Sequence, residues 1–306
     1  MSLPVKCWWA FFIFIQNTTI MKICAISDTH GILNYIKVDQ QCDVLVIAGD
    51  FSPLKLQEAV SEKEKTNTMK WWIRNVFIDW LLHIPANQII FTPGNHDFVT
   101  GMIWFKEWIN GVLYEMGIHD RIHYICNEQI TIDGVTFWGC PYSDLPGWAW
   151  YSDCNPELYT PPKDTDVMIV HAAPNYGGLG ETINRWGHTA NYGSDYLVNA
   201  LAGCLNLPKL LICGHIHSGQ HKPQLYTRTI EVLEQPAPNV KGLVKKKKKQ
   251  KCVMVNVSIK DEGYNEYYTP ATIDYDCTPD RISSAITVKH IRYDELEDIN
   301  TFILNR

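Results

Sequence analysis

The chain has 306 residues, of which 46% are hydrophobic and 20% are charged, and its formal net charge at pH 7 is −6. A chain of this length and apolar content can bury one large core or two modest ones, as a soluble globular protein does. The negative net charge argues against a protein whose main task is to hold long nucleic acid, because such proteins usually carry a basic surface.

The first 20 residues are an apolar extension in which residues 7–15 read CWWAFFIFI. This run is too short to cross a membrane as a helix, and no transmembrane span is expected. No small-x-small cleavage site follows it. Three interpretations stay open: a non-native or mis-started extension with Met21 as the true start, an extra strand or membrane-touching segment, and a secretion signal.

Beyond residue 20, apolar runs of strand length alternate with longer amphipathic stretches, a pattern typical of an α/β sheet with parallel strands inside it. Residues 130–139 also read as a hairpin, because Asp133 and Gly134 supply the positive φ that a tight two-residue turn needs. The predicted parallel strands cover residues 22–27, 43–49, 88–92, 166–170 and 209–213. The predicted helical stretches cover residues 54–83, broken somewhere along their length, 102–116 and 194–205.

Residues 245–249 are five consecutive lysines, and Lys251 follows them closely. Because so many like charges repel one another, we expect a solvated, mobile loop over residues 241–251. Contact with nucleic acid or with an anionic membrane is the alternative. The C-terminal tail, residues 277–306, is expected to pack as a helix or a strand against the domain that precedes it.

Each of the five predicted strands is followed at once by a polar motif: SDTHG, GDF, GNHD, HAAP and GHIH, in chain order. In a largely parallel sheet the carboxyl ends of the strands share one edge, so residues from 28 to 217 can meet there. Single motifs are weak signals, because an isolated Asp-x-His pair is often a surface pair or a helix cap. The conjunction of all five, in this order, indicates one site.

The residues at these strand ends are two carboxylates, one amide and several imidazoles, without a thiolate. This mixture favours manganese, iron, zinc or nickel, with manganese as the first expectation. The donors are too many for one ion, and a carboxylate can bridge two, so we expect two divalent metal ions. Such a pair lowers the pKa of water to about 7 and supplies hydroxide for attack on phosphorus. The candidate metal ligands are Asp28, His30, Asp50, Asn95, His171, His215 and His217.

These motifs, over about residues 21–276, resemble the calcineurin-like metallophosphoesterase superfamily. In detail, the chain resembles the small metallophosphoesterase-domain subgroup of this superfamily, in which ISDTHG, GNHD, an HGPP-like segment and GHIH recur in this order. Here the fourth segment is HAAP, which retains the histidine and the final proline. The resemblance implies one domain at residues 21–276 with a layered α/β sandwich of mixed, largely parallel β-sheets flanked by helices.

The resemblance also implies how the ligands divide between the two ions. One ion would be bound by Asp28, His30 and His217. The other would be bound by Asn95, His171 and His215, with Asp50 as the bridge between them.

Two further residues of the GNHD motif are implied to take part in catalysis. His96 would face the substrate, where it stabilises charge or protonates the leaving oxygen. Asp97 would favour the charged form of His96. The Trp-rich residues 138–151 either overhang this site and stack on a base or serve as core and loop staples, and the spread of 11 tryptophans along the chain favours the staples.

The sequence therefore predicts a two-metal phosphoesterase that hydrolyses a small phosphodiester or phosphomonoester, with a nucleotide among the candidates. A metal-dependent nuclease is the second hypothesis, and the lysine run is its support. A non-catalytic interaction module is the third, although no ligand position is missing. The ten cysteines include no CxxC pair and several lie in apolar runs, so we expect reduced thiols and a cytoplasmic location.

Overall fold

The computed structural model of the chain describes residues 20–292, apart from residues 35, 39, 59–61, 184–185, 237–241, 261–265, 285 and 289. Except for Ile20, the predictions for the N-terminal extension lie outside these residues. Within the described part of the chain, every helix is too short or too polar to cross a bilayer.

The first of two six-stranded sheets contains the N-terminal strands. Its order is β15-β14-β1-β2-β3-β4, in which β1 to β4 run parallel while β14 and β15 are antiparallel additions. The strands are β1 (Met21–Ile26), β2 (Cys42–Ala48), β3 (Ala86–Thr92), β4 (Ile122–Tyr124), β14 (Ala271–Tyr275) and β15 (Ile286–Thr287).

The second sheet has the order β11-β12-β10-β7-β6-β5, with four parallel strands in the middle and an antiparallel strand at each edge. Its strands are β5 (Glu128–Ile132), β6 (Val135–Cys140), β7 (Val167–Val170), β10 (Leu210–Cys213), β11 (Gln224–Glu234) and β12 (Val244–Asn256). Two small antiparallel pairs complete the strands: β8 (Glu181–Ile183) with β9 (Thr189–Asn191), and β13 (Glu266–Tyr268) with β16 (His290–Arg292).

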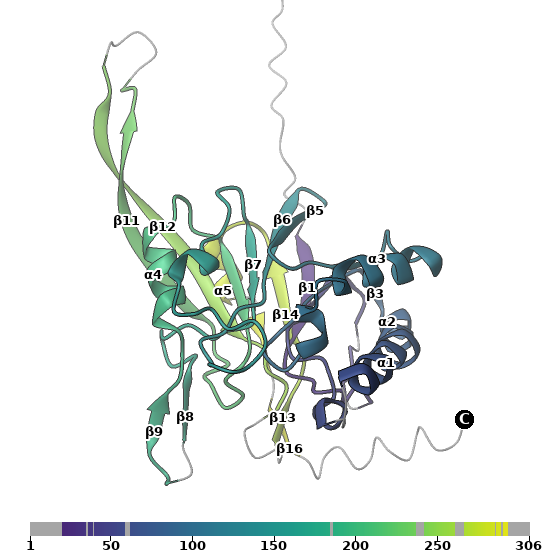
Figure 1. The fold of residues 1–306 in the computed structure, drawn as a ribbon. Coiled ribbons are helices and arrows are strands. Elements are labelled where there is room, and N and C mark those ends of the chain that lie inside the picture. Colours follow the sequence, from purple (N-terminus) through teal and green to yellow (C-terminus); the bar gives the residue numbers. More distant parts are fainter. Residues whose placement is uncertain are drawn as a thin grey trace, which may run out of the picture.

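Helices cover the outer faces of the two sheets (Figure 1). They are α1 (Glu62–Trp72), which continues through a π-helical turn at Ile73–Phe77 into α2 (Ile78–His83), then α3 (Phe105–Glu115) and α4 (Asp195–Gly203). The short helix α5 (Pro279–Ser284) instead contacts β12 and β14, and its Ile282 enters the core between the two sheets. Single 3-10 turns lie at Leu54–Glu58, Phe98–Gly101 and Pro156–Tyr159.

Strand β2 illustrates how the layers form. Because successive side chains of a strand point to opposite faces, Val44 and Val46 enter the core between the two sheets, while Leu45 and Ile47 enter the core under α1, α2 and α3. A third core, which includes Leu211 of β10, lies under α4. The result is a sandwich of two mixed, largely parallel sheets between layers of helix, which confirms the predicted fold class.

The predicted strands and helices agree with the structure to within a few residues at their ends. The predicted hairpin is formed by β5 and β6, and its turn residues Asp133 and Gly134 have φ angles of 47° and 80°. The first helical stretch is irregular, as expected: it contains a 3-10 turn at Leu54–Glu58, and the π-helical turn at Ile73–Phe77 interrupts it between α1 and α2.

The expectation of a loop over the lysine run is wrong, because the lysines lie in β12 and pair with β11 from Val244 to Met254. The strand forms despite the repulsion because neighbouring lysines point to opposite faces of the ribbon. Glu231 and Glu234 of β11 also form ion pairs with Lys245 and Lys246 at 3.2 and 3.1 Å.

Candidate metal centre

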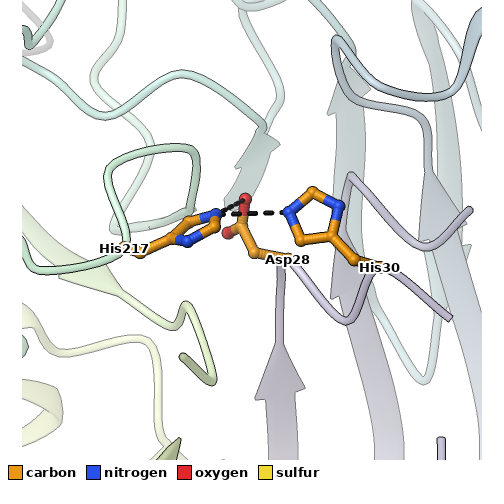
Figure 2. Close-up of side chains that lie close together, drawn as sticks. All are labelled: Asp28, His30 and His217. Atoms are coloured by element: carbon orange, nitrogen blue, oxygen red, sulfur yellow. Dashed lines mark hydrogen bonds and ion pairs between the residues drawn. The ribbon is translucent and has the colours of Figure 1, made fainter. Parts of the chain in front are cut away.

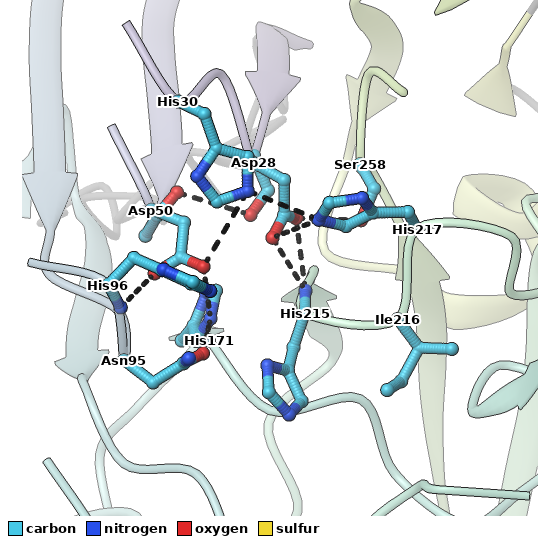
Figure 3. Close-up of polar contacts among 12 residues, drawn as sticks. Asp28, His30, Asp50, Asn95, His96, His171, His215, Ile216, His217 and Ser258 are labelled. Carbon is cyan, nitrogen blue, oxygen red and sulfur yellow. Dashed lines mark hydrogen bonds and ion pairs between the residues drawn. The ribbon is translucent and has the colours of Figure 1, made fainter. Parts of the chain in front are cut away.

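The carboxyl ends of the parallel strands from both sheets meet at one edge of the sandwich. The backbone N–H of Ser27, after β1, donates to the carbonyl of Val257, after β12, at 3.0 Å, and Ile259 donates back to Ser27 at 3.1 Å. These bonds join the first sheet to the second at the place where the polar motifs emerge. Figure 3 shows the side chains that gather there.

One group of metal-ligating atoms consists of Asp28, His30 and His217 (Figure 2). The Nε2 atoms of the two histidines face each other at 3.3 Å, and Nε2 of His217 lies 3.4 Å from Oδ1 of Asp28. One donor atom from each residue lies within 4.8 Å of the others, and all three residues are buried. Such a cluster has the size needed to surround a single cation.

A second group consists of Asp28, Asp50 and His171. Oδ2 of Asp50 lies 3.3 Å from Nε2 of His171 and 3.9 Å from Nε2 of His30, so this oxygen lies between the two groups. Oδ1 of Asn95 lies 2.8 Å from the same His171 nitrogen. Two carboxylates therefore connect the groups: Asp28 belongs to both, and Asp50 faces a histidine of each.

His215 is the predicted ligand whose ring does not join either group. Its backbone N–H donates to the Asp28 carboxylate at 3.0 Å, and its ring lies 5.1 Å from the ring of His171. Figure 3 shows the imidazole directed away from Asp28. The structure thus brings six predicted ligand side chains together and leaves the seventh beside them.

The backbone of this site is held in an unfavourable conformation. Asp28, His30, Asp50 and His215 have φ angles of 58°, 45°, 53° and 70°, in the left-handed region that non-glycine residues rarely adopt. Such residues cost about 1–3 kcal/mol each and persist only where the surrounding structure holds them. Here the turns are held across the sheet, for example by the N–H of His30 donating to the Asp50 carbonyl at 2.9 Å.

The glycines of the motifs make room for the ligands. A Cβ atom on Gly94 would lie 2.4 Å from Oδ1 of Asp50, and a Cβ on Gly214 would lie 2.0 Å from Oγ of Ser27 and 2.4 Å from Oδ2 of Asp28. Any side chain at these positions would displace a ligand. This close approach explains why GNHD and GHIH begin with glycine.

Burial and charge together give four of the predicted ligands the protonation states that metal binding requires. Burial acts to raise the pKa of the Asp28 and Asp50 carboxyls, but the neighbouring histidines outweigh it, and both pKa values fall below the usual range. Burial lowers the pKa of His30 to about 3 and that of His215 to about 4. Charged carboxylates and neutral imidazoles are the forms that bind a metal ion.

His171 shows the arrangement expected of a metal-binding histidine. Its Nδ1 lies 3.0 Å from the Ala48 carbonyl, so the ring donates from that nitrogen and directs Nε2 toward Asp50 and Asn95. Although burial acts to lower the pKa of His171, the Asp50 charge raises it to about 9. A metal ion at this nitrogen would therefore have to displace the proton that the Asp50 charge favours. The oxygen and nitrogen donors of the buried cluster otherwise fit a pair of divalent cations.

The two predicted catalytic residues occupy different environments. The ring centroid of His96 lies 4.2 Å from that of Trp148 and 5.0 Å from that of His30, at the edge of the cluster. The buried Asp97 carboxylate instead accepts hydrogen bonds from the backbone N–H groups of Asp50, Ser52 and Gly94, at 2.9, 2.9 and 2.8 Å.

This geometry does not agree with the expectation that Asp97 favours the charged form of His96. Burial lowers the pKa of His96. Burial and the Asp50 charge raise the pKa of Asp97 itself to about 7. Asp97 is a positioning residue that ties the GDF and GNHD loops together, because its side chain is directed at backbone amides rather than at the imidazole.

Sequence reasoning missed two side chains that interact with Asp28. The hydroxyl of Ser258 donates to Oδ2 of Asp28 at 2.7 Å. Lys260 is fully buried within range of the Asp28 charge, and burial lowers its pKa to about 8, against the opposing effect of Asp28. Both residues follow β12, just as the ligand motifs follow the other strands. The segment VMVNVSIK therefore shows the same pattern, polar residues directly after an apolar strand, by which the other motifs were identified.

The tryptophans of residues 138–151 serve different purposes. Trp138 is buried in the core under α4, and the indole N–H of Trp150 donates to the Thr100 hydroxyl at 2.8 Å, which makes both of them structural. Trp148 instead lies against His96 and is partly exposed. One ring therefore overhangs the site, while the interpretation as staples holds for the other two.

An open cleft of about 670 Å³ adjoins the cluster at His215. The small β8–β9 hairpin and the segment around it contribute Ile183, Trp186 and Tyr192 to its wall, and all three side chains are exposed. Asp144 also lines the cleft. The cleft is large enough for a small organic phosphate and offers it aromatic surface.

Comparison with known proteins links this site to one family. The family model for calcineurin-like phosphoesterases matches residues 21–219, a span that contains every predicted ligand and both predicted catalytic residues. The UPF0046 protein K07C11.7 of Caenorhabditis elegans is 29% identical over 183 residues, which cover 56% of this chain and 58% of that protein. The match thus spans less than two thirds of the length of this relative.

Proposed function

Because the chain belongs to the calcineurin-like phosphoesterase family, we propose that it is a metal-dependent hydrolase of small phosphate esters. The observation that carries this proposal is the pair of buried donor groups that share Asp28 at the carboxyl edge of both sheets. Perturbed, buried ionisable residues that converge at a sheet edge are the usual setting of an active site.

The residues fit two divalent cations. Asp28, His30 and His217 would hold one, and Asn95 and His171 would hold the other, with Asp50 between them and the His215 ring close by. Manganese is the first candidate for this mixture of oxygen and nitrogen donors, and iron, zinc or nickel would also suit it. Bound divalent cations lower the pKa of water for attack on phosphorus and hold the phosphate oxygens.

The chain itself supplies the groups that orient the reaction. His96, whose backbone N–H donates to Oδ1 of Asp50 at 2.8 Å, would direct its ring to the substrate, where it would stabilise charge or, in its protonated form, donate a proton to the leaving oxygen. Trp148 packs against that ring and limits its movement. Asp97 would keep the loops of Asp50 and His96 in register through its three backbone hydrogen bonds.

The cleft beside His215 supports a small substrate with an apolar or aromatic group, for which a nucleotide is the first candidate. Exposed Trp186 and Tyr192 offer faces on which such a group would stack. The nuclease hypothesis loses its main support, because the lysine run of β12 precedes the segment paired with β10 and so lies toward the opposite edge of the sheet.

We also propose that the protein acts in the cytoplasm. The nine cysteines among the described residues are all free thiols, and six of them are buried. Free thiols persist in reducing compartments.

The proposed activity is tested with a panel of esters and added manganese. The panel contains p-nitrophenyl phosphate, bis(p-nitrophenyl) phosphate, p-nitrophenyl phenylphosphonate, cyclic nucleotides and single-stranded DNA. We expect hydrolysis of a small ester that chelation abolishes and added metal restores. Preferred cleavage of DNA would favour the nuclease, and a metal-loaded protein that hydrolyses none of these compounds would contradict the proposal.

A further inference from the structure

The outer part of the β11–β12 hairpin extends beyond the sheet to which it belongs. Strand β10 pairs with β12 only from Val253 onward, whereas β11 pairs with β12 from Val244. Residues 244–249 of β12 and their partners in β11 therefore form a two-stranded ribbon, which projects from the body of the protein (Figure 1). The next pair, Arg228 and Gln250, is hydrogen-bonded to the end of α4 and the loop after it. The outer ribbon is defined here as residues 228–236 and 242–249.

The far end of the outer ribbon exposes large aliphatic side chains. Leu233, Leu243 and Val244 are 61%, 63% and 42% exposed. They lie at the same end of the ribbon, but Leu233 pairs with Lys245 whereas Val244 pairs with Glu234, so Leu233 and Val244 point to opposite faces of that end. Water contact with three such side chains at one end of a ribbon is unfavourable, and clustered exposed apolar groups mark interaction sites.

Lysines follow these aliphatic side chains along β12, from Lys245 to Lys249. Within the part of the chain that the structure describes, Lys245 and Lys246 have glutamate partners, but Lys247, Lys248 and Lys249 have no acidic group within ion-pair distance. Apart from Arg228, whose guanidinium donates to carbonyls at the end of α4, the outer ribbon carries five lysines against two glutamates, whereas the whole chain has a net charge of −6. The ribbon is thus a local cationic surface on an acidic protein.

Lysines alone have a simpler explanation, since proteins often place them on exposed edge strands to prevent pairing with other chains. That explanation does not account for the aliphatic end. Nucleic acid does not account for it either, because phosphates gain little from Leu and Val, and the outer ribbon carries no aromatic ring on which a base would stack.

A bilayer with anionic lipid matches both features. Aliphatic side chains enter the boundary between headgroups and acyl chains, while lysines extend their ammonium groups to the lipid phosphates and carboxylates. The cytoplasmic leaflet supplies the negative surface potential that attracts such clusters of lysine. We propose that the outer ribbon of β11 and β12 docks this protein on membranes that contain anionic lipid.

The topology makes docking compatible with access to the metal centre. Strand β12 runs from the outer ribbon toward Asn256, and the ligand-bearing loops follow the carboxyl ends of the neighbouring strands. The aliphatic end and the metal centre therefore lie toward opposite edges of the second sheet. A membrane at the ribbon would leave the metal centre open to a water-soluble substrate.

The test measures co-sedimentation of the full chain with vesicles of phosphatidylcholine, with or without phosphatidylserine. We expect binding that requires phosphatidylserine and weakens as salt is raised, because salt screens the lysine contribution. A first variant combines Lys247→Gln, Lys248→Gln and Lys249→Gln, and it should lower the partition coefficient at least tenfold. A second combines Leu233→Ser, Leu243→Ser and Val244→Ser, and it should cause a comparable loss.

The matched control carries the same change of charge at exposed lysines far from the ribbon: Lys37→Gln, Lys55→Gln and Lys63→Gln. This control should bind vesicles like the unsubstituted protein. All variants should keep the thermal unfolding midpoint and the hydrolysis of soluble esters, so that loss of docking is distinguished from loss of folding or activity.

Three results would overturn the proposal. In the first, the unsubstituted protein fails to bind vesicles that contain phosphatidylserine. In the second, both ribbon variants bind these vesicles as well as the control does. The second result would direct attention to the apolar residues 7–15. In the third, a DNA duplex would bind through the lysines without any need for the aliphatic residues and would displace the vesicles, which would identify nucleic acid as the partner.

Discussion

Asp28 and Asp50 combine three features that rarely occur together: complete burial, a carboxyl pKa held below its usual range, and a left-handed backbone. A buried carboxylate is costly unless it is paired, and backbone strain adds to the cost. The structure tolerates both at the same positions, which indicates that the loops are organised for a ligand rather than for stability alone.

Asp50→Ala removes the oxygen that lies between His30 and His171, so we expect it to release most of the bound metal. Turnover should fall by more than about 100-fold, since even outer groups at metal sites contribute about 10–100-fold. Metal content by mass spectrometry and hydrolysis rates give the measurement. Asp120→Ala, at an exposed aspartate whose side chain is 94% accessible, serves as the control. Full metal occupancy in the Asp50 variant would refute its bridging role.

His96→Ala tests the opposite behaviour, retention of metal with loss of turnover. The ring lies beside the cluster without belonging to either donor group, so metal content should stay unchanged. We expect kcat to fall by about 100- to 10,000-fold, the usual contribution of a general acid or base. His119→Ala, at a partly exposed histidine far from the cluster along the chain, is the control. An unchanged rate would remove His96 from the mechanism.

Among the elements, the loops that follow the strands are shaped by glycine as much as by the ligands. Gly94 and Gly214 allow the loops after β3 and β10 to lie against Asp50 and Asp28 with no space for a methyl group. The glycines of the GNHD and GHIH motifs are thus explained by the close packing of these loops against the ligand carboxylates. In the lysine-bearing ribbon, pairing between β11 and β12 outweighs the repulsion between neighbouring charges.

Gly94→Ala should therefore impair the metal centre although alanine carries no functional group. Its Cβ would lie 2.4 Å from Oδ1 of Asp50, so the loop or the carboxylate must move. We expect metal affinity and turnover to fall at least about tenfold, as for other changes that misplace a ligand.

The matched control is Gly111→Ala within α3, where a Cβ would meet nothing within 4 Å. This change should leave metal binding intact and stabilise the protein by about 0.5–1 kcal/mol, because alanine is the better helix former. Denaturant unfolding and metal titration of both variants make the comparison. Equal metal affinity in the two variants would contradict the proposed close approach.

At the scale of the whole molecule, the metal centre is built at the seam between the two sheets. Asp28, His30, Asp50 and Asn95 come from the first sheet, whereas His171 and His217 come from the second. A cation bound across this seam would hold the two sheets together. Metal should therefore contribute to global stability and not only to catalysis.

Removal of metal should lower the thermal unfolding midpoint by about 5–10 °C when the metal was present at about 100 times its dissociation constant. The reason is that ligands which bind only the folded state stabilise it by mass action. Calorimetry with and without a chelator gives the measurement, and Asp50→Ala should respond little to the chelator. A midpoint that is independent of metal in the unsubstituted protein would mean that no cation bridges the sheets.

The pattern of the sequence was sufficient to predict an α/β protein with parallel strands, its main strands and helices, and the sheet edge at which the motifs meet, whereas the layered sandwich was implied by the family resemblance. Apolar runs identify buried strands, and parallel strands must end at a common edge, so these conclusions need only local pattern and chain order. Tertiary structure alone decided that Asp97 accepts hydrogen bonds from backbone amides, that the Ser258 hydroxyl donates to Asp28, and that the lysine run pairs as a strand. These features depend on contacts between residues far apart in the chain, whose burial and pairing outweigh local propensity and charge.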